Sequence, residues 1–382
     1  MYHKLPVIFF LFYLTFFFPF YASAFFFNKK DQDKYKKETF VINDAVKRYL
    51  VKSKNSRGTI TINILEIDLS NENVSLMVGL PDKRNINKKS TLSNIVMQEM
   101  AFAGINANYF EKDGTPLGLL ISDGSLITGP IYSRVAIGFS EDKNIFIDQV
   151  MLEADVTVSR GFFKKKPLFM VTFDCLNTSS NHCQNVSLLD LKWSKKIKLP
   201  KNKLAFRMEK NCLESKDTRT VNRPSTGFLL VGNKKGTLGQ LKTNDCLDIA
   251  WKTLPDWSIV KEAISGGPYL LMSGEVYIDE ENEHIHFGKK DHFAPRSAIG
   301  IDEKKKLYLV AVDGRQENYS VGFSLIEFAD FLKDFGIKDA INLDGGGSTE
   351  IVLNGEVLNK PSDGEERLIG NALLIFYDAT AK

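Results

Sequence analysis

The 382-residue sequence has little of what marks several common functional classes. Its formal net charge is only +3 and its basic and acidic residues are interspersed, so binding to nucleic acid or to an anionic membrane surface is not indicated. It has four cysteines, but no Cys-x-x-Cys pair and no histidine spacing typical of a zinc site. Beyond the N-terminus no second long apolar run occurs. At 382 residues the chain is long enough for one large globular domain or two modest ones.

The N-terminus has the pattern of a secretory signal peptide. A basic start at residues 1–4 precedes an apolar run over residues 5–21, and Ala22-Ser23-Ala24 supplies small residues for cleavage. We therefore expect residues 1–24 to be removed and the protein to be secreted or periplasmic, without stable membrane insertion. An uncleaved membrane anchor is the alternative, because an apolar run of about 17 residues just spans a bilayer and Phe25 follows directly.

The cysteines all fall in one middle segment, at Cys175, Cys183, Cys212 and Cys246. In an exported chain disulfides persist, and four cysteines allow three pairings. Sequence proximity favours Cys175 with Cys183 and Cys212 with Cys246. A structural role is expected for them rather than a reactive thiol.

The chain divides into three predicted parts. Residues 25–57 are interpreted as an N-terminal arm with one amphipathic helix, because apolar residues recur at helix-like spacing, at Val41, Ile42, Ala45, Val46, Tyr49 and Leu50. From residue 58 to 378 strand patterns dominate and form the main domain. Within it, residues 153–257 are more polar, hold all the cysteines and show no catalytic constellation, so we interpret them as an elaboration on the core.

The clearest helix covers residues 324–336. Ser324 and Glu327 fit a capping box, and Gly336 supplies the C-terminal stop. The helix connects a strand ending at Asp313 to a strand ending at Asp344, which predicts a β-α-β crossover with parallel strands. Their carboxyl ends would then lie at one edge of the sheet, so both carboxylates are expected in one cleft.

Asp344 opens the most informative stretch, Asp344-Gly-Gly-Gly-Ser-Thr349, between two apolar strand-like runs. Glycines lack a Cβ atom, so their N–H groups can approach a ligand closely. The alternative is an ordinary glycine-rich hairpin with an Asp cap. A similar apolar strand with Ser265-Gly266-Gly267 precedes it in the chain, and Asn106 and Asn108 lie on one face of another predicted strand.

Other charged residues complete the candidate site. Arg296 and Arg315 would suit an anionic substrate, because guanidinium groups bind phosphate oxygens bidentately. The loop with His284, His286 and His292 has metal-binding residue types, although a solvated loop is the preferred interpretation. A divalent cation held by Asp313 and Asp344 is a minority alternative to the expectation of no cofactor.

Six motifs in order resemble the phosphodiester glycosidase domain family. They are Ile105-Asn-Ala-Asn-Tyr-Phe110, Ile264-Ser-Gly-Gly-Pro-Tyr-Leu270, Arg296-Ser-Ala-Ile-Gly300, Val312-Asp-Gly-Arg-Gln316, Tyr319-Ser-Val-Gly322 and Ile341-Asn-Leu-Asp-Gly-Gly-Gly-Ser-Thr349. The resemblance covers about residues 104–377 and is weak over residues 153–257. It implies an α+β fold, with mixed β-sheets and flanking helices. It also implies hydrolysis of an N-acetylglucosamine-1-phosphodiester-like substrate at the anomeric carbon.

The predicted chemistry assigns roles within this set. Asp344 or Asp313 is expected to stabilise the sugar cation or to activate water. Arg296 and the backbone amides of Gly345, Gly346 and Gly266 are expected to hold phosphate oxygens. Asn106, Asn108 and Ser348 are expected to orient sugar hydroxyls. The predicted substrate-binding residues are Asn106, Asn108, Ser265, Gly266, Gly267, Arg315, Gly345, Gly346, Ser348 and Thr349. Two alternatives stay open: a non-catalytic envelope or exopolysaccharide-associated protein that binds phosphoglycans, and a metal-dependent phosphodiesterase that cleaves the P–O bond.

Overall fold

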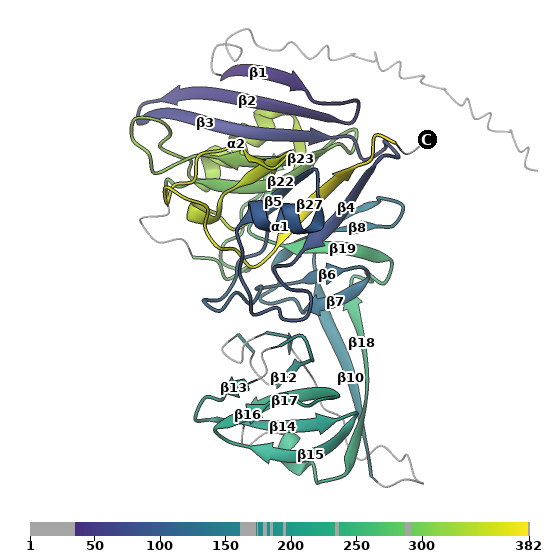
Figure 1. Ribbon diagram of the computed structural model, residues 1–382. Coiled ribbons are helices and arrows are strands. Elements are labelled where there is room, and N and C mark those ends of the chain that lie inside the picture. Colours follow the sequence, from purple (N-terminus) through teal and green to yellow (C-terminus); the bar gives the residue numbers. More distant parts are fainter. Residues whose placement is uncertain are drawn as a thin grey trace, which may run out of the picture. The chain divides into compact units, whose positions relative to one another are not determined.

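The computed structural model describes residues 35–160, 173, 175–178, 182–183, 186–193, 196–233, 237–286 and 292–380 (Figure 1). The predicted signal peptide lies outside these residues. The described part contains five β-sheets of eight, seven, five, five and two strands. It contains two α-helices, α1 (Leu92–Glu99) and α2 (Leu325–Phe335), and the short 3-10 helices η1 (Thr237–Gln240) and η3 (Gly346–Ser348).

Three sheets form the main domain, and in each of them neighbouring strands are hydrogen-bonded to one another. The eight-stranded sheet is β1 (Tyr35–Val41), β2 (Val46–Asn55), β3 (Gly58–Ile67), β23 (Leu307–Val312), β22 (Arg296–Asp302), β24 (Ile337–Asn342), β20 (Tyr269–Met272) and β21 (Glu275–Val276). One five-stranded sheet is β7 (Ser125–Thr128), β6 (Leu120–Ser122), β19 (Val260–Ser265), β8 (Val135–Ser140) and β9 (Ile145–Gln149). The other is β26 (Glu356–Val357), β25 (Ile351–Leu353), β5 (Ala103–Asn106), β27 (Ala372–Tyr377) and β4 (Val74–Gly79).

The inserted sheet has seven strands: β10 (Met151–Arg160), β18 (Asp245–Leu254), β15 (Cys212–Asp217), β14 (Lys203–Glu209), β17 (Gly227–Asn233), β12 (Val186–Leu189) and β11 (Cys175–Leu176). A two-stranded sheet of β13 (Lys196–Lys198) and β16 (Thr220–Asn222) accompanies it. The long strands β10 and β18 pair with each other along their whole length, so the chain enters and leaves the inserted sheet side by side (Figure 1).

The predicted α+β class is wrong, because the described part is mostly β-sheet. Helix α2 has the predicted capping box of Ser324 and Glu327 and ends at Gly336, whose φ is 102°. It buries its apolar face against one side of the eight-stranded sheet. Most other hydrophobic surface is covered by a second sheet rather than by helices, which makes this an assembly of packed sheets.

The N-terminal arm is also corrected, because residues 35–55 form the strands β1 and β2 rather than a helix. The β2 strand pairs along its full length with β3, which supplies backbone hydrogen bonds that an isolated arm lacks. Val46, Tyr49 and Val51 are β-branched or aromatic residues, which favour strands, and all three are buried. Tertiary pairing therefore overrides the helix-like spacing.

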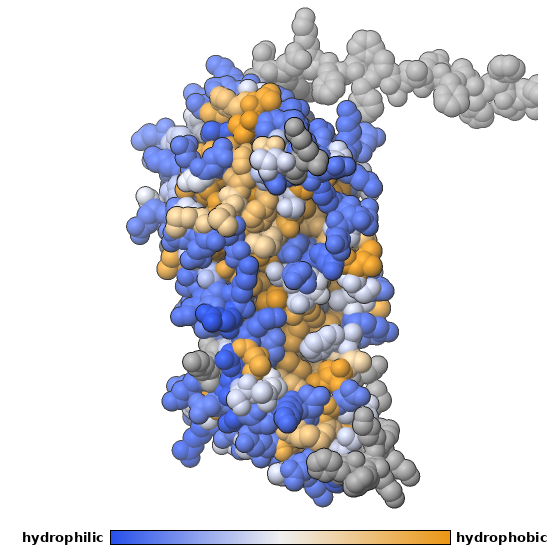
Figure 2. Space-filling view, turned by 45° about the vertical axis from the view of Figure 1, so that its right-hand side comes forward, coloured by the Kyte–Doolittle hydropathy of each residue, from blue (hydrophilic) through white to orange (hydrophobic). Residues whose placement is uncertain are grey.

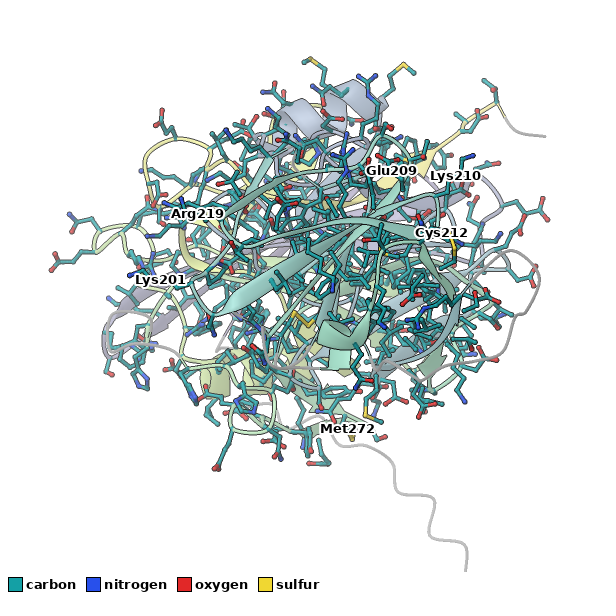
Figure 3. All side chains as sticks on the ribbon, turned by 90° about the horizontal axis from the view of Figure 1, so that it is seen from below. Lys201, Glu209, Lys210, Cys212, Arg219 and Met272 are labelled. Atoms are coloured by element: carbon teal, nitrogen blue, oxygen red, sulfur yellow. A yellow bond between two sulfur atoms is a disulfide. The ribbon has the colours of Figure 1, made fainter. Side chains whose placement is uncertain are left out.

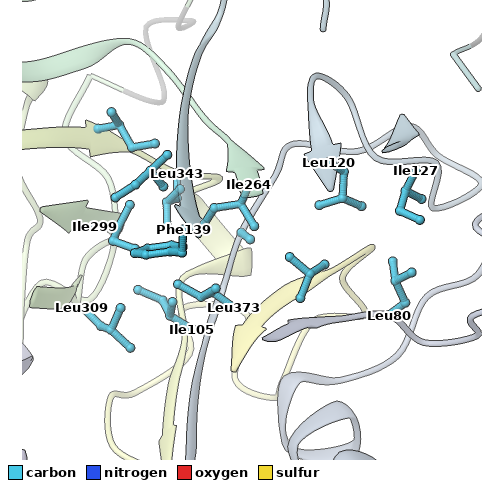
Figure 4. Close-up of a cluster of buried hydrophobic side chains, with 14 of the residues drawn as sticks. Leu80, Ile105, Leu120, Ile127, Phe139, Ile264, Ile299, Leu309, Leu343 and Leu373 are labelled. Atoms are coloured by element: carbon cyan, nitrogen blue, oxygen red, sulfur yellow. The ribbon is translucent and has the colours of Figure 1, made fainter. Parts of the chain in front are cut away.

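One hydrophobic core joins the three sheets that surround the site (Figure 4). It is built from buried side chains such as Ile299 of the eight-stranded sheet, Ile264 of one five-stranded sheet and Ile105 of the other. Leu343, next to the glycine run, is fully buried in the same core. The turn that follows it therefore starts from a rigid support.

The inserted sheet contributes buried residues such as Leu189, Leu229 and Val231 to this core and has a second core of its own. Both disulfides lie in the inserted segment. The predicted pairing is confirmed, since Cys175 is bonded to Cys183 and Cys212 to Cys246. On the face shown in Figure 2, hydrophobic residues are visible between hydrophilic ones, and the large exposed hydrophobic residues include Trp251 of β18. Within the described ranges, neither α-helix has the length and apolarity needed to cross a bilayer.

Candidate active site

The glycine run is not a hairpin. It leaves β24 of the eight-stranded sheet, forms η3 and enters β25 of a different sheet. The backbone of Asp344 is fixed to the end of β5, since its N–H donates to the Ala107 carbonyl at 3.0 Å and its carbonyl accepts from Asn106 Nδ2 at 2.6 Å. The turn thus holds the Asp344 side chain where the two sheets meet.

Two clefts meet at Asp344. The first, which we call the arginine cleft, has a volume of about 520 Å³. The ionisable residues in its lining are Arg134, Arg296, Arg315, Arg367, His284, His286 and Asp344. The second, the carboxylate cleft, has a volume of about 590 Å³. Its charged lining comprises Glu111, Asp344, Asp363, Glu365, Glu366, Lys89, Lys112 and Arg367. Asp344 is the one carboxylate that lines both, and Tyr109 and Arg367 are also shared.

Asp344 is electrostatically distinct from a surface aspartate. Burial raises its pKa to about 6, and the nearby Ser348 hydroxyl and Arg367 guanidinium oppose this rise. At neutral pH the carboxylate is therefore mostly ionised, yet it is poised to take a proton. Perturbed acids of this kind are candidates for proton transfer.

Arg296 and Arg315 both line the arginine cleft, as the sequence predicted them to share a site. Arg296 is 3% exposed at the start of β22, and its Nε donates to the Phe323 carbonyl at 3.1 Å. Arg315 lies over Gly346, where an added Cβ atom would come within 3.0 Å of its Nη1. Gly346 also has a φ of 62°, a left-handed conformation that favours a glycine here.

Tyr109 and Arg134 are site residues that the sequence did not reveal as such. The Tyr109 hydroxyl donates to the Gly267 carbonyl at 2.9 Å and accepts from Asn342 Nδ2 at 2.8 Å. The Arg134 guanidinium lies 5.3 Å from the Tyr109 ring centroid, and burial lowers the pKa of Arg134. Tyr109 could have been found as part of the Asn106–Phe110 motif, whereas Arg134 belongs to no motif.

Asp313 does not line a cleft together with Asp344, contrary to the prediction that the two carboxylates share one. It is 1% exposed, and its carboxylate accepts hydrogen bonds from Asn359 Nδ2, the Lys360 N–H and the Tyr319 hydroxyl at 2.9–3.3 Å. Burial raises its pKa to about 6 in spite of these bonds. Asp313 lines neither cleft, so its position fits a buried anchor for the 359–360 segment.

Asn106 and Asn108 also have internal roles rather than the predicted contact with sugar hydroxyls. Each is 1% exposed. The Asn106 carbonyl oxygen accepts from the Ser297 hydroxyl and the Glu350 N–H, and its amide donates to Asp344. Asn108 bonds to carbonyls of the 117–119 segment and accepts from the Ser265 N–H. Both asparagines therefore hold backbone segments next to the clefts in place through buried hydrogen bonds.

The glycine amides are largely committed to the fold, contrary to the prediction that they bind phosphate. The N–H groups of Gly266, Gly267 and Gly346 donate to backbone carbonyls at 3.0, 2.7 and 2.9 Å. Ser265 is buried, and its hydroxyl donates to the Val135 carbonyl. Of this predicted set, Gly345 and Gly346 do line the arginine cleft. Close packing of backbone explains the glycines better than ligand binding.

Ser348 and Thr349 lie behind the turn, 1% and 2% exposed. Ser348 lines the carboxylate cleft, whereas Thr349 lines neither cleft. The predicted histidine loop is divided: His284 and His286 line the arginine cleft, and the backbone of His292 accepts from Arg296 at 3.4 Å. Among the residues with described positions, no group of three or more His, Cys, Asp or Glu side chains is arranged to hold a metal ion.

Comparison with known proteins confirms the family resemblance. The model of the phosphodiester glycosidase family matches residues 214–376, which include Arg296, Arg315, Asp344 and Arg367. Tyr109 and Arg134 lie outside the matched segment.

Individual relatives agree with this match over part of the chain. N-acetylglucosamine-1-phosphodiester alpha-N-acetylglucosaminidase of Bos taurus is 39% identical over 111 residues, which are 27% of this chain and 21% of the relative. The alignment thus spans about a fifth of that relative's length.

Solved structures show a similar fold over most of the chain. A hypothetical protein from Synechocystis has a TM-score of 0.78 at 22% identity, covering 90% of this chain and 64% of that one. The catalytic domain of the zebrafish N-acetylglucosamine-1-phosphodiester alpha-N-acetylglucosaminidase has a TM-score of 0.50 at 19% identity, covering 90% and 89%.

Proposed function

We propose, from the membership of residues 214–376 in the phosphodiester glycosidase family, that this chain hydrolyses a sugar-1-phosphodiester at the anomeric carbon. Water adds to the anomeric carbon, the bond from that carbon to the phosphate oxygen breaks, and a free sugar and a phosphomonoester are released. The observation that carries the proposal is the place of Asp344, which lines both an arginine-rich and a carboxylate-rich cleft.

The arginine cleft suits the phosphate of the substrate. Its lining carries four guanidinium groups against the single carboxylate of Asp344. Guanidinium groups bind phosphate oxygens through paired hydrogen bonds, and burial of Arg296 reduces screening of its charge. The carboxylate cleft then faces the sugar, whose hydroxyl groups donate readily to carboxylate oxygens.

Asp344 would act on the water molecule. With a pKa of about 6 it is mostly ionised at neutral pH and can accept the proton that water loses as it attacks. The departing phosphomonoester is a good leaving group, so it needs little protonation. One carboxylate at the junction can therefore suffice, where many glycosidases use a pair.

Hydrolysis in water enriched in oxygen-18 tests the proposal. We expect N-acetylglucosamine-1-phosphodiester to yield N-acetylglucosamine that carries the label and an unlabelled phosphomonoester. Label in the phosphate would instead identify a phosphodiesterase that cleaves the P–O bond. Binding of the diester without any product would identify a phosphoglycan-binding protein.

Arg134→Ala is expected to raise KM for the diester roughly tenfold with a smaller change in kcat, since a guanidinium that binds the ground-state phosphate is lost. Steady-state kinetics measure the effect. Arg84→Ala, which removes an exposed arginine outside both clefts, is the matched control and should leave KM unchanged. An unchanged KM in Arg134→Ala would remove Arg134 from the phosphate site.

The same proposal includes export of the chain. Two disulfides support it, because disulfides persist in oxidising compartments outside the cytoplasm. Fractionation of producing cells tests it, and recovery of the chain only from the cytoplasm would contradict it.

A further inference from the structure

The inserted sheet reaches the rim of the site through one histidine. His182 lies in the loop that the Cys175–Cys183 disulfide closes. Its Nε2 lies 2.7 Å from Glu111 Oε1, and its Nδ1 lies 3.0 Å from the Tyr132 hydroxyl. One neutral imidazole tautomer satisfies both contacts, with Nε2–H donating to the carboxylate and Nδ1 accepting from the hydroxyl.

One partner of His182 lines a cleft, and the other packs against residues that line the second cleft. Glu111 lines the carboxylate cleft. The Tyr132 ring lies 5.0 Å from the ring of His284 and 5.9 Å from the Arg134 guanidinium, and both of these residues line the arginine cleft. His182 therefore connects a side chain of the carboxylate cleft to a tyrosine that packs against the arginine cleft, although it comes from neither of the sheets that carry Asp344.

Leu176 and Asn177, which precede His182 between the two bonded cysteines, are hydrogen-bonded to the rest of the protein. Asn177 is fully buried; its side-chain amide donates to the Ile127 carbonyl at 2.8 Å, and its oxygen accepts from the Asp190 N–H at 2.8 Å. The Gly129 N–H donates to the Leu176 carbonyl at 2.8 Å. The disulfide and these bonds give His182 a defined position, with its side chain 25% exposed.

We propose that His182 is a positioning residue for the saccharide side of the site, so that the inserted sheet determines which sugar is accepted. It acts by fixing Glu111 in the wall of the carboxylate cleft, where a carboxylate can accept hydrogen bonds from sugar hydroxyls. The assignment of this cleft to the sugar rests on the proposed function. The competing explanation is that His182 only ties the inserted sheet to the domain.

The test compares wild type with His182→Leu, which removes both hydrogen bonds, and His182→Gln, which retains a donor and an acceptor. Calorimetry with N-acetylglucosamine 1-phosphate and with inorganic phosphate measures the two sides of the site separately. We expect His182→Leu to lower the affinity for N-acetylglucosamine 1-phosphate roughly tenfold and to leave the affinity for inorganic phosphate unchanged. His182→Gln should recover part of the lost affinity. In hydrolysis, the ratio of kcat/KM between N-acetylglucosamine and glucose 1-phosphodiesters should fall in parallel.

Two further variants keep the proposal falsifiable. If His182→Leu does not fold, Tyr132→Phe removes one of the two bonds without changing the size of the ring, and a smaller loss of the same selectivity is expected. Lys201→Ala, at an exposed lysine of the inserted sheet, is the control (Figure 3).

The outcomes separate the two proposals. The role of His182 would be overturned if His182→Leu lowered the affinity for both ligands equally or left the affinity for the sugar phosphate unchanged. It would also be overturned if wild type bound neither ligand. Absence of hydrolysis in wild type, with the calorimetric difference retained, would overturn the glycosidase and leave a sugar-phosphate site that His182 shapes.

Discussion

Replacing Asp344 by asparagine is expected to lower kcat roughly 10³-fold while KM changes little, because a group that accepts a proton in the transition state is removed. The asparagine has nearly the same shape, and the backbone bonds of Asp344 to the 106–107 segment do not involve its side chain. Steady-state kinetics on the diester measure the loss. A decrease of less than tenfold would show that Asp344 shapes the site without doing its chemistry.

The pH dependence of wild-type kcat/KM tests the same role of Asp344 by a second measurement. Only ionised Asp344 accepts a proton, so kcat/KM should rise with pH through the pKa of about 6 and level off above it. Asp344→Asn should lack this limb in its residual activity. A flat wild-type profile between pH 5 and 7 would contradict the role.

Asp313→Asn is the matched comparison, because burial also raises the pKa of Asp313 to about 6 but it lines neither cleft. Its three hydrogen-bond donors would then face an amide, so a lower free energy of unfolding is expected. The folded protein should keep most of its kcat. Equal loss of kcat in both variants would return Asp313 to the catalytic candidates.

These two aspartates also show how far the sequence could predict the site. The β23 and β24 strands both pair antiparallel with β22 and are joined through α2, so they run parallel and their carboxyl ends do lie at one edge. The strand pattern does not reveal that β22 lies between them. Nor does it reveal that the 359–360 segment covers Asp313, because both depend on distant parts of the chain.

The glycines and asparagines were assigned to the right region, and the structure shows that their polar groups are largely hydrogen-bonded within the fold. Local sequence shows that Gly266 and Gly346 permit close backbone approach, but not whether a ligand or another strand makes that approach. Arg296 and Asp344 were recognisable because they stand in motifs, whereas Arg134, Arg367 and His182 come from segments without one. Tertiary packing brings Arg134 and Arg367 into the clefts and His182 into contact with Glu111, and no pattern within a single strand reveals these positions.

A second large effect is expected at Glu350, which follows the glycine run. It is 2% exposed, and neither of its carboxylate oxygens has a hydrogen-bond partner in the part of the chain that the structure describes. Burial, and then repulsion by Glu366, raises the pKa of Glu350 to about 8. In the folded protein the Glu350 carboxyl group is therefore mostly protonated at neutral pH. Ionisation of this buried group destabilises the folded state.

The sign of the resulting pH dependence follows from linkage. Between pH 4.5, where the unfolded chain releases the proton, and about 8, where the folded protein does, the unfolded state binds fewer protons. The contribution of Glu350 to the free energy of unfolding therefore falls as pH rises through this window. At about 1.4 kcal/mol per pH unit the full fall is roughly 5 kcal/mol. Glu350→Gln, which is neutral at every pH, should remove it.

We therefore expect Glu350→Gln to be close to wild type in urea unfolding at pH 4 and more stable by about 4 kcal/mol at pH 8. Glu356→Gln, at an exposed glutamate six residues further along the chain, is the control and should follow the wild-type profile. If the free energy of unfolding had the same pH dependence in wild type and Glu350→Gln, the Glu350 carboxylate would be stabilised in the folded protein, for example by a hydrogen bond to water. A profile that diverges as predicted would mean that the segment just after the glycine turn is stabilised by keeping its glutamate protonated.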